Sequence, residues 1–243
     1  MNKIWPGFDA AVRDIPDGAV IAFAGFAAPG MPLNLTAALK RQGARNLTCV
    51  SNRPGGGVGM PEDSADVGIL VKNGQVKRMI SSFTAGTRAR QTLAFEALYE
   101  AGEIEGELVP QGTLVERLRA AGAGIPAFYT PTGWGTEIAE GKEVRQFGGR
   151  GYVLEMALPV DYAFLRARRA DLLGNLQYRL SQRNYNPVMA MAATTVIVEV
   201  EEDFVEPGEL DPDSIHTPSI LVHRMVQIPP APEGLWPDRP GAK

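Results

Sequence analysis

Short apolar runs alternate with helical patterns through the first half of the chain. The first run, Ala19–Phe23, has the length of a buried strand and leads into a loop with Gly25 and Gly30. A helical pattern begins near Leu35 and stops at Gly43. A strand, a glycine loop and a helix in this order can turn backbone N–H groups toward an anion. The same loop can equally be a tight turn that needs glycine only for its backbone angles.

The alternation continues to about residue 130. Strands that alternate with helices at this spacing predict parallel βαβ units, and therefore an α/β fold with an open, mainly parallel sheet and flanking helices. We expect Thr113 to cap the last of these helices, with Glu116 completing a capping box. The further strands are expected at 46–51, 77–83, 107–110 and 127–129, and the further helices at 65–71, 88–101 and 113–121.

The pattern changes after Pro131, where helical spacing gives way to strands and turns. The elements expected here are a hairpin within 142–158, a short helix at 187–193, and strands at 194–200 and 220–228. We therefore predict a single domain over 1–243, with a β-rich elaboration at about 137–185 and a proline-rich tail at 229–243.

Composition narrows the class of protein. The 243 residues are 44% hydrophobic and 21% charged, as in ordinary globular proteins that bury a full core. The net charge of −4, without a basic run, argues against a nucleic-acid partner. No stretch approaches the ~18 apolar residues of a membrane span, and the first residues lack the apolar core of a signal peptide. We predict a soluble, cytoplasmic protein with no membrane partner.

The sequence contains no recognisable catalytic nucleophile. Cys49 is the only cysteine and lies in an apolar run, so we expect an inert core thiol, no disulfide and no metal site. Both histidines, His216 and His223, fall late in the chain and are interpreted as structural. The serine-hydrolase elbow, the phosphate-binding loops and the zinc-protease motif are all missing.

Uncharged polar residues nevertheless follow several predicted strands. Gly25 and Gly30 follow the first strand, Asn52 the second and Gln111 the fourth, while Ser82 ends the third. Ligands on open α/β sheets bind beyond the carboxyl ends of the strands. Side-chain amides there can orient a carboxylate or a developing oxyanion, or can merely close their own turns. The pattern thus predicts half of a site: groups that bind and stabilise, without a group that attacks.

Several stretches resemble family I CoA-transferases. The signature of that family runs Asp-Gly, apolar residues, Gly-Gly-Phe and Gly-x-Pro, and it is similar to residues 17–32, where Ala24 replaces the first glycine. The other matching stretches are LTCVSN (47–52), VKRMISSF (76–83), ELVPQGTLVERLRAAGAGIPAFYTPTGWGT (107–136), YVLEMALPVDYAFLRA (152–167), LGNLQYR (173–179), RNYNPVMAMAA (183–193) and ELDPDSIHTPSILVHRMV (209–226). Together they cover nearly the whole chain and resemble the α (A) subunit of 3-oxoacid CoA-transferases of the acetoacetate or 3-oxoadipate type.

The resemblance implies a ping-pong transfer of CoA from an acyl-CoA such as succinyl-CoA to a 3-oxoacid such as 3-oxoadipate or acetoacetate. In this family a glutamate attacks the acyl-CoA to give an anhydride, which CoA converts to a glutamyl thioester, and the acceptor acid reverses these steps. That glutamate lies in a Glu-Asn-Gly motif of the β (B) subunit, and this chain has no Glu-Asn pair. The resemblance therefore implies an obligatory β subunit in an α2β2 complex, with CoA as a substrate and no permanently bound cofactor.

The resemblance also implies roles for single residues. Asn52 and Gln111 match the residues that bind the substrate carboxylate near the glutamate. Further substrate contacts are expected from Gly25, Phe26, Gly30 and Ser82.

One loop departs from the acetoacetate-type relatives. Where they have Val-Gly-Glu-Asn after the third strand, this chain has the more basic Thr84–Arg88. Arg88 suits a second carboxylate on the substrate, or else begins a solvent-exposed helix. Two alternatives to CoA transfer stay open: hydrolysis of a CoA thioester on the same fold, and non-catalytic binding of an acyl-CoA or a 3-oxoacid.

Overall fold

The computed structural model describes residues 2–56, 65–84 and 93–229. Arg88 and the tail from residue 230 onward lie outside the described residues. Within the described part, no helix combines the length and the hydrophobicity that crossing a bilayer requires.

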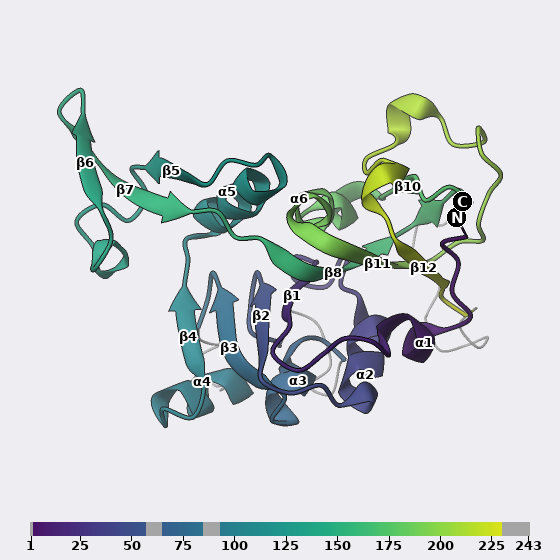
Figure 1. The fold of residues 1–243 in the computed structure, drawn as a ribbon, viewed down its shortest axis with the longest axis horizontal. Helices are drawn as coiled ribbons and strands as arrows, with labels where there is room; N and C mark the ends of the chain where they lie inside the picture. The colour runs from purple at the N-terminus through teal and green to yellow at the C-terminus, as the bar shows by residue number, and fades with distance from the viewer. Residues whose placement is uncertain (1, 57–64, 85–92, 230–243) are drawn as a thin grey trace.

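A seven-stranded sheet forms the centre of the molecule (Figure 1). Its strands are β1 (Val20–Phe23), β2 (Leu47–Ser51), β3 (Val76–Ser81), β4 (Glu105–Leu108), β8 (Val160–Ala167), β11 (Ala193–Val200) and β12 (Arg224–Gln227). They lie in the order β12-β11-β8-β1-β2-β3-β4, and every neighbouring pair is parallel. The predicted open parallel sheet is confirmed. The strand order reverses at β1, which lies between β2 and β8, and such a reversal opens a crevice at the carboxyl ends of the strands.

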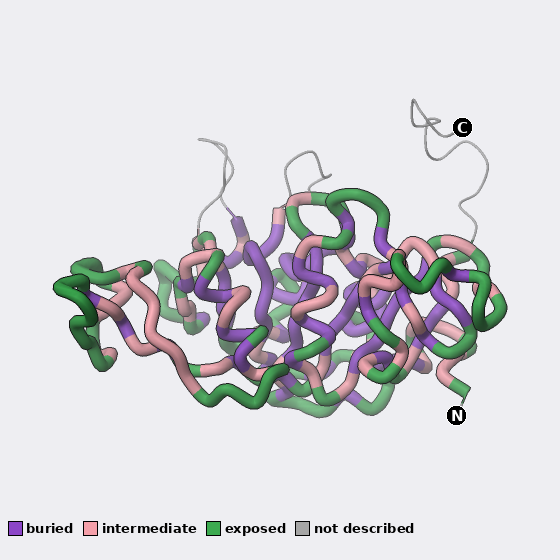
Figure 2. The backbone as a smooth tube through the Cα atoms, turned by 90° about the horizontal axis from the view of Figure 1, so that it is seen from above, coloured by how far each residue is buried: buried purple, intermediate pink, exposed green. Residues whose placement is uncertain are grey.

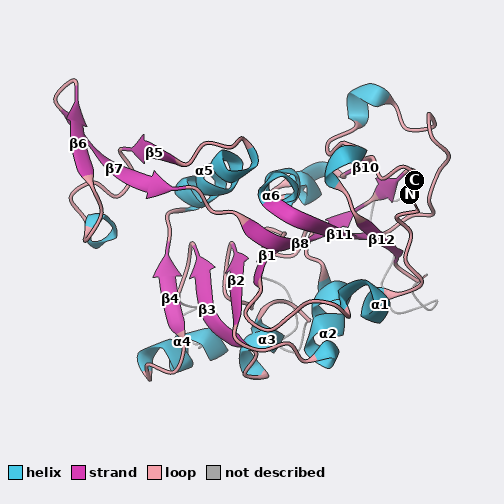
Figure 3. Cartoon of the chain, in the orientation of Figure 1, coloured by secondary structure: helices cyan, strands magenta, loops and turns pink. Residues whose placement is uncertain are grey.

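Helices cover both faces of this sheet (Figure 3). The helices on one face are α1 (Phe8–Val12), α2 (Leu33–Gln42), α3 (Gly68–Lys72) and α4 (Ala94–Glu100). On the other face lie α5 (Gln111–Gly122) and α6 (Asn186–Ala192). Alternate residues of one strand point to opposite cores: Ile21 and Phe23 of β1 pack with α2, and Ala22 packs with α5 and α6. Because both faces are covered at the centre of the sheet, β1 is a continuous apolar run and β2 is nearly one, which is why the sequence predicted these two strands well.

Cys49 on β2 is fully buried in the α2 core. Burial raises the pKa of the Cys49 thiol well above its ordinary value. The predicted burial of this thiol in the core is therefore confirmed.

A second, smaller sheet extends from the body beyond α5 (Figure 1). Its strands are β5 (Ala127–Thr130), β6 (Val144–Phe147) and β7 (Arg150–Met156), and both pairings, in the order β5-β7-β6, are antiparallel. Gly148 and Gly149 form the two-residue turn between β6 and β7 with positive φ at both positions, so the predicted hairpin is confirmed. Figure 2 shows buried backbone through the body and mainly intermediate or exposed residues along this sheet.

Three expectations about the placement of strands differ from the structure. Residues 127–129 were expected in the parallel sheet, but β5 pairs antiparallel with β7, and its residues are only partly buried. The elaboration expected at about 137–185 includes β8, which is a central strand of the main sheet. The last strand is limited to β12, because residues 219–221 form a 3₁₀ turn.

The start of α5 also differs from the prediction. The helix begins at Gln111 with Pro110 as its N-cap, and Leu114 N donates to Pro110 O at 2.9 Å. Thr113 therefore lies inside the first turn and does not cap the helix, and the capping box with Glu116 does not form. This earlier start places Gln111 directly above the carboxyl end of β4.

The remaining elements are short. They are β9 (Arg169–Ala170), β10 (Leu176–Gln177) and 3₁₀ turns at Glu137–Ala139, Leu180–Arg183, Pro212–Ser214 and Ser219–Leu221.

Candidate functional site

The carboxyl ends of β2, β3 and β4 bring three of the predicted site residues together. Asn52 directly follows β2, Ser82 directly follows β3, and Gln111 begins α5 beyond β4. Gln111 Nε2 donates to Asn52 Oδ1 at 2.5 Å. Ser82 N donates to the Asn52 carbonyl at 3.2 Å. The parallel sheet therefore gathers side chains that are 30 and 59 positions away from Asn52 in the sequence.

Tyr185 completes the group and was not predicted. Its Oη donates to Asn52 Oδ1 at 3.2 Å, and only 4% of the residue is exposed. Burial raises the pKa of Tyr185 to about 12, while the Ser82 and Gln111 side chains beside it oppose the rise. Tyr185 therefore keeps its proton at neutral pH and acts as a donor. We refer to Asn52, Ser82, Gln111 and Tyr185 as the Asn52 cluster.

The hydrogen bonds within the cluster determine what Asn52 can offer a ligand. Both donors, Gln111 and Tyr185, reach its Oδ1 atom, and no described residue accepts a hydrogen bond from its Nδ2. The amide is thus fixed with its oxygen occupied and its two N–H groups available. Fixed donors of this kind suit a carboxylate or a developing oxyanion.

Ser82 adds a buried hydroxyl to the cluster. Its Oγ atom lies beside the Tyr185 side chain, and no hydrogen bond of good geometry joins it to a described residue. A buried polar atom without a partner is costly and is commonly found where a ligand or water binds. The cluster therefore presents several hydrogen-bonding groups and no base.

Gly25 and Phe26 lie in the loop after β1. Gly25 has a φ of +114°, and a Cβ atom there would lie 2.4 Å from Met31 Cγ, so this position requires glycine. Phe26 N donates to Pro29 O at 3.2 Å, while 46% of the residue is exposed. The loop is closed on itself and presents an aromatic ring to the surface.

Gly30 contacts a different part of the chain. A Cβ atom there would lie 2.7 Å from both Asn186 Nδ2 and Gln182 O, and φ is +77°. Asn184 Nδ2 donates to Pro29 O at 3.0 Å beside it. The structure thus places Gly30 against the segment that carries Tyr185, where close packing joins the β1 loop to that segment.

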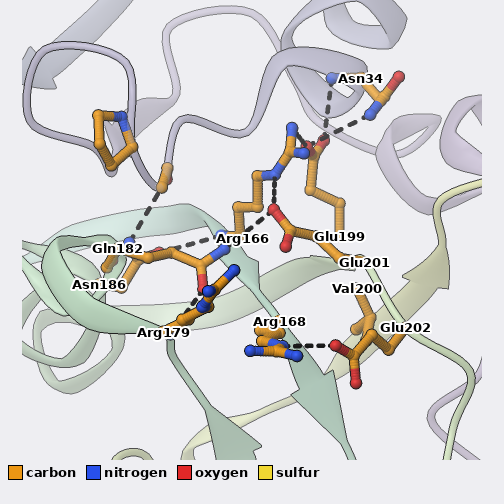
Figure 4. A network of polar contacts seen from close by, with 12 residues as sticks. Asn34, Arg166, Arg168, Arg179, Gln182, Asn186, Glu199, Val200, Glu201 and Glu202 are labelled. Atoms are coloured by element: carbon orange, nitrogen blue, oxygen red, sulfur yellow. Dashed lines mark hydrogen bonds and ion pairs between the residues drawn. The ribbon is translucent and has the colours of Figure 1, made fainter. Parts of the chain in front are cut away.

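A buried carboxyl group holds the end of the same loop (Figure 4). Glu199 of β11 accepts hydrogen bonds from Asn34 N at 2.9 Å and Leu35 N at 3.1 Å, in the first turn of α2. Arg166 of β8 lies 3.2 Å from its other oxygen and also binds Glu201 at 2.7 Å. Gln182 donates to Glu201 at 3.1 Å. This network fixes α2 and the segment before Tyr185 to the main sheet.

The stability of the protein should depend on pH through Glu199. Burial raises the pKa of Glu199 to about 7 from an ordinary value of 4.5, against the opposing effect of Arg166 and the N–H donors. The folded state therefore holds the Glu199 proton more tightly than the unfolded state does. The resulting contribution to the free energy of unfolding is complete below about pH 4.5 and is lost as the pH rises through 7.

We expect the free energy of unfolding of the wild type to fall by about 3 kcal/mol between pH 4.5 and 8, relative to that of Glu199→Gln. Urea unfolding of both proteins at a series of pH values measures this difference. A difference that stays constant over the range would contradict the assignment.

The two histidines take structural positions. His216 Nδ1 accepts from Tyr178 N and His223 Nδ1 accepts from Val196 N, both at 3.0 Å. Their ring nitrogens thus hold backbone groups, as the sequence suggested. Within the described residues, no histidine, cysteine or carboxylate is hydrogen-bonded to the Asn52 cluster.

Comparison with known proteins shows the family to which this chain belongs. Residues 7–227 match the sequence profile described as Coenzyme A transferase. The chain is 46% identical to the A subunit of the 3-oxoadipate CoA-transferase of Pseudomonas putida, over 94% of each chain. It is 47% identical to the A subunit of a probable succinyl-CoA:3-ketoacid coenzyme A transferase of Bacillus subtilis, over 93% of this chain and 90% of the relative.

A solved structure has the same fold. An acyl-CoA transferase of Escherichia coli O157:H7 superposes with a TM-score of 0.76 and 24% sequence identity, over 94% of this chain. The chain spans 47% of the length of that longer protein. The profile match over most of the chain, and the two relatives of nearly equal length, decide the assignment: this chain belongs to the coenzyme A transferase family, and it is a CoA-transferase.

Proposed function

We propose that this chain is the α subunit of a heteromeric enzyme that transfers CoA from succinyl-CoA to a 3-oxoacid, with the nucleophilic glutamate on a separate β subunit. One observation carries the proposal: the Asn52 cluster offers fixed hydrogen-bond donors and, within the described residues, no attacking group. The names of both relatives support a second subunit, because each name designates one subunit of an enzyme. An α2β2 assembly, a cytoplasmic location and the lack of a permanently bound cofactor belong to the same proposal.

The reaction would proceed through two carbonyl additions for each half-reaction. The partner's glutamate carboxylate attacks the thioester carbonyl, and the C–S bond breaks. The CoA thiolate departs, and an acyl-glutamyl anhydride remains. The thiolate then attacks the glutamyl carbonyl, so that a glutamyl thioester forms and the acyl group departs as a carboxylate. The acceptor acid repeats these steps in reverse.

The residues of this chain stabilise those steps without forming bonds. Each addition places negative charge on a carbonyl oxygen, and preorganised donors lower the free energy of that state. The Asn52 Nδ2 group is such a donor, because Gln111 and Tyr185 hold its oxygen. Between the additions, the Asn52 Nδ2 group orients the carboxylate of the acid that has been released from the thioester.

The acceptor acid is part of the proposal. The relatives are named for 3-oxoadipate and for 3-ketoacids in general, and 3-oxoadipate carries two carboxylates. We propose that Arg88, in the segment outside the described residues, favours the acid with the second carboxylate. An exchange assay with Arg88→Ala tests this role, since an unchanged preference between 3-oxoadipate and acetoacetate would remove it.

Reconstitution tests the proposed function. Succinyl-CoA and a 3-oxoacid are incubated with this chain alone and then with its β subunit, while formation of the 3-oxoacyl-CoA is followed. We expect transfer only in the mixture. Release of CoA without an acceptor acid would identify a hydrolase instead. Binding of the acyl-CoA by the isolated chain, with no activity gained from the β subunit, would identify a non-catalytic binding protein.

A further inference from the structure

Arg53 is a buried cation next to the Asn52 cluster. It directly follows Asn52 in the chain, and only 7% of the residue is exposed. Its Nε and Nη2 atoms are buried, and no described residue accepts a hydrogen bond from either. Burial lowers the pKa of Arg53, but a guanidinium stays protonated throughout the physiological range. A buried charge with unused hydrogen-bond donors costs folding free energy, which points to a ligand that binds these donors.

The two available atoms have a particular geometry. In a guanidinium, Nε–H and one Nη–H lie on the same edge and point in nearly the same direction. This edge is the fork that binds the two oxygens of one carboxylate or two oxygens of a phosphate. Asp66 lies close enough for its charge to oppose the lowering of the Arg53 pKa. Its oxygens accept from Gly56 N at 2.7 Å and Gly68 N at 2.9 Å, which fixes the loop around Arg53.

Arg53 lines a small cavity between two loops. The loop after β1 forms one wall through Gly25, Ala27 and Met31, and the loop after β2 forms the other. Asn52 lines the same cavity, which therefore adjoins the Asn52 cluster. Its volume of about 20 Å³ accommodates one water molecule or a group of similar size. A carboxylate at the end of a short chain fits this size, whereas a nucleotide does not.

We infer that Arg53 binds the second carboxylate of a dicarboxylic acyl group, the one that does not react, and so selects dicarboxylic over monocarboxylic substrates. This inference rests on the proposed transfer function. The reacting carboxyl group lies at the Asn52 cluster, and the far end of the acid enters the cavity beneath the β1 loop. The anion at Arg53 then receives two parallel hydrogen bonds and neutralises the buried charge.

Two acids of equal length test the inference with the assembled α and β subunits. 3-Oxoadipate carries the second carboxylate, and 3-oxohexanoate has a methyl group in its place. In a ping-pong reaction, kcat/KM for the acceptor reports only the second half-reaction, so the donor does not affect the comparison. We expect Arg53→Gln to lower kcat/KM for 3-oxoadipate by ~10- to 100-fold, mainly by raising KM. The kcat/KM for 3-oxohexanoate should stay within about twofold of the wild-type value.

Two further variants sharpen the result. Arg53→Lys keeps the charge without the fork, so we expect an intermediate loss for 3-oxoadipate alone. Arg45→Gln removes an exposed arginine and should leave kcat/KM unchanged for both acids. An equal fall in kcat/KM for both acids in Arg53→Gln would overturn the inference, because it would mean that Arg53 binds the reacting carboxylate or a phosphate of CoA. No loss for either acid would overturn it as well.

The wild-type complex provides a test that does not depend on folding of the variants. It should prefer 3-oxoadipate to 3-oxohexanoate by at least ~10-fold in kcat/KM. Equal use of both acids would reject the role of Arg53, together with that proposed for Arg88, while leaving CoA transfer intact. If the complex transfers CoA to neither acid while other assays give hydrolysis or binding alone, the proposed function fails first, and this inference fails with it.

Discussion

Replacing Asn52 with alanine should lower kcat of the assembled enzyme by ~10²- to 10³-fold. The variant removes the N–H groups that we assign to the oxyanion, and it leaves Gln111 Nε2 and Tyr185 Oη without their common acceptor. Because the proposed contact strengthens as charge develops, the loss should fall mainly on kcat and only weakly on KM. Steady-state transfer from succinyl-CoA to the preferred 3-oxoacid measures both constants.

Asn73→Ala is the matched control for this experiment. Asn73 is exposed at the end of α3, on the opposite end of the sheet from the cluster, and should leave the activity within twofold. A rise in KM at unchanged kcat would show that Asn52 contributes only to ground-state binding. A loss below about fivefold in both constants would contradict the role of the cluster altogether.

The Glu199→Ala variant should lose about 3 kcal/mol of unfolding free energy. The truncation leaves the N–H groups of Asn34 and Leu35 without their acceptor, removes one partner of Arg166, and opens a cavity between β11 and α2. Since the network also fixes the segment that carries Tyr185, we expect activity to fall in parallel at temperatures where the fold persists. Urea unfolding followed by circular dichroism measures the loss.

Glu202→Ala provides the comparison. Glu202 forms ion pairs with Arg168 and Arg169, but all three side chains are substantially exposed. Exposed pairs contribute little, so the loss should stay below about 1 kcal/mol. Equal losses from Glu199→Ala and Glu202→Ala would contradict the structural role that we assign to the buried network.

The main sheet and part of the site follow directly from the sequence. Strands buried on both faces are continuous apolar runs, so 19–23 and 46–51 were found within a residue or two of β1 and β2. Parallel strands align their carboxyl ends, and this alone predicts that Asn52 and Gln111 approach each other. The hydrogen bond between their side chains agrees with that argument.

Other features depend on tertiary structure that a local pattern does not encode. Tyr185 reaches Asn52 from 133 positions away, because β8 returns beside β1 and α6 crosses over the sheet. Arg53 looks like a solvated charge in a glycine loop, and only the packing of the β1 loop buries it. For β5, the pattern indicates a strand but not its partner, which arrives later in the chain as β7.

Covalent labelling shows which subunit supplies the nucleophile: we assign it to the second subunit, while this chain supplies the binding groups. The assembled α and β subunits are incubated with succinyl-CoA without an acceptor acid, and the intact mass of each chain is measured. We predict a mass increase equal to one thioester-linked CoA on the β subunit, with an unchanged mass for this chain. CoA attached to this chain would contradict this division of roles, because it would show that the α subunit holds an attacking group of its own.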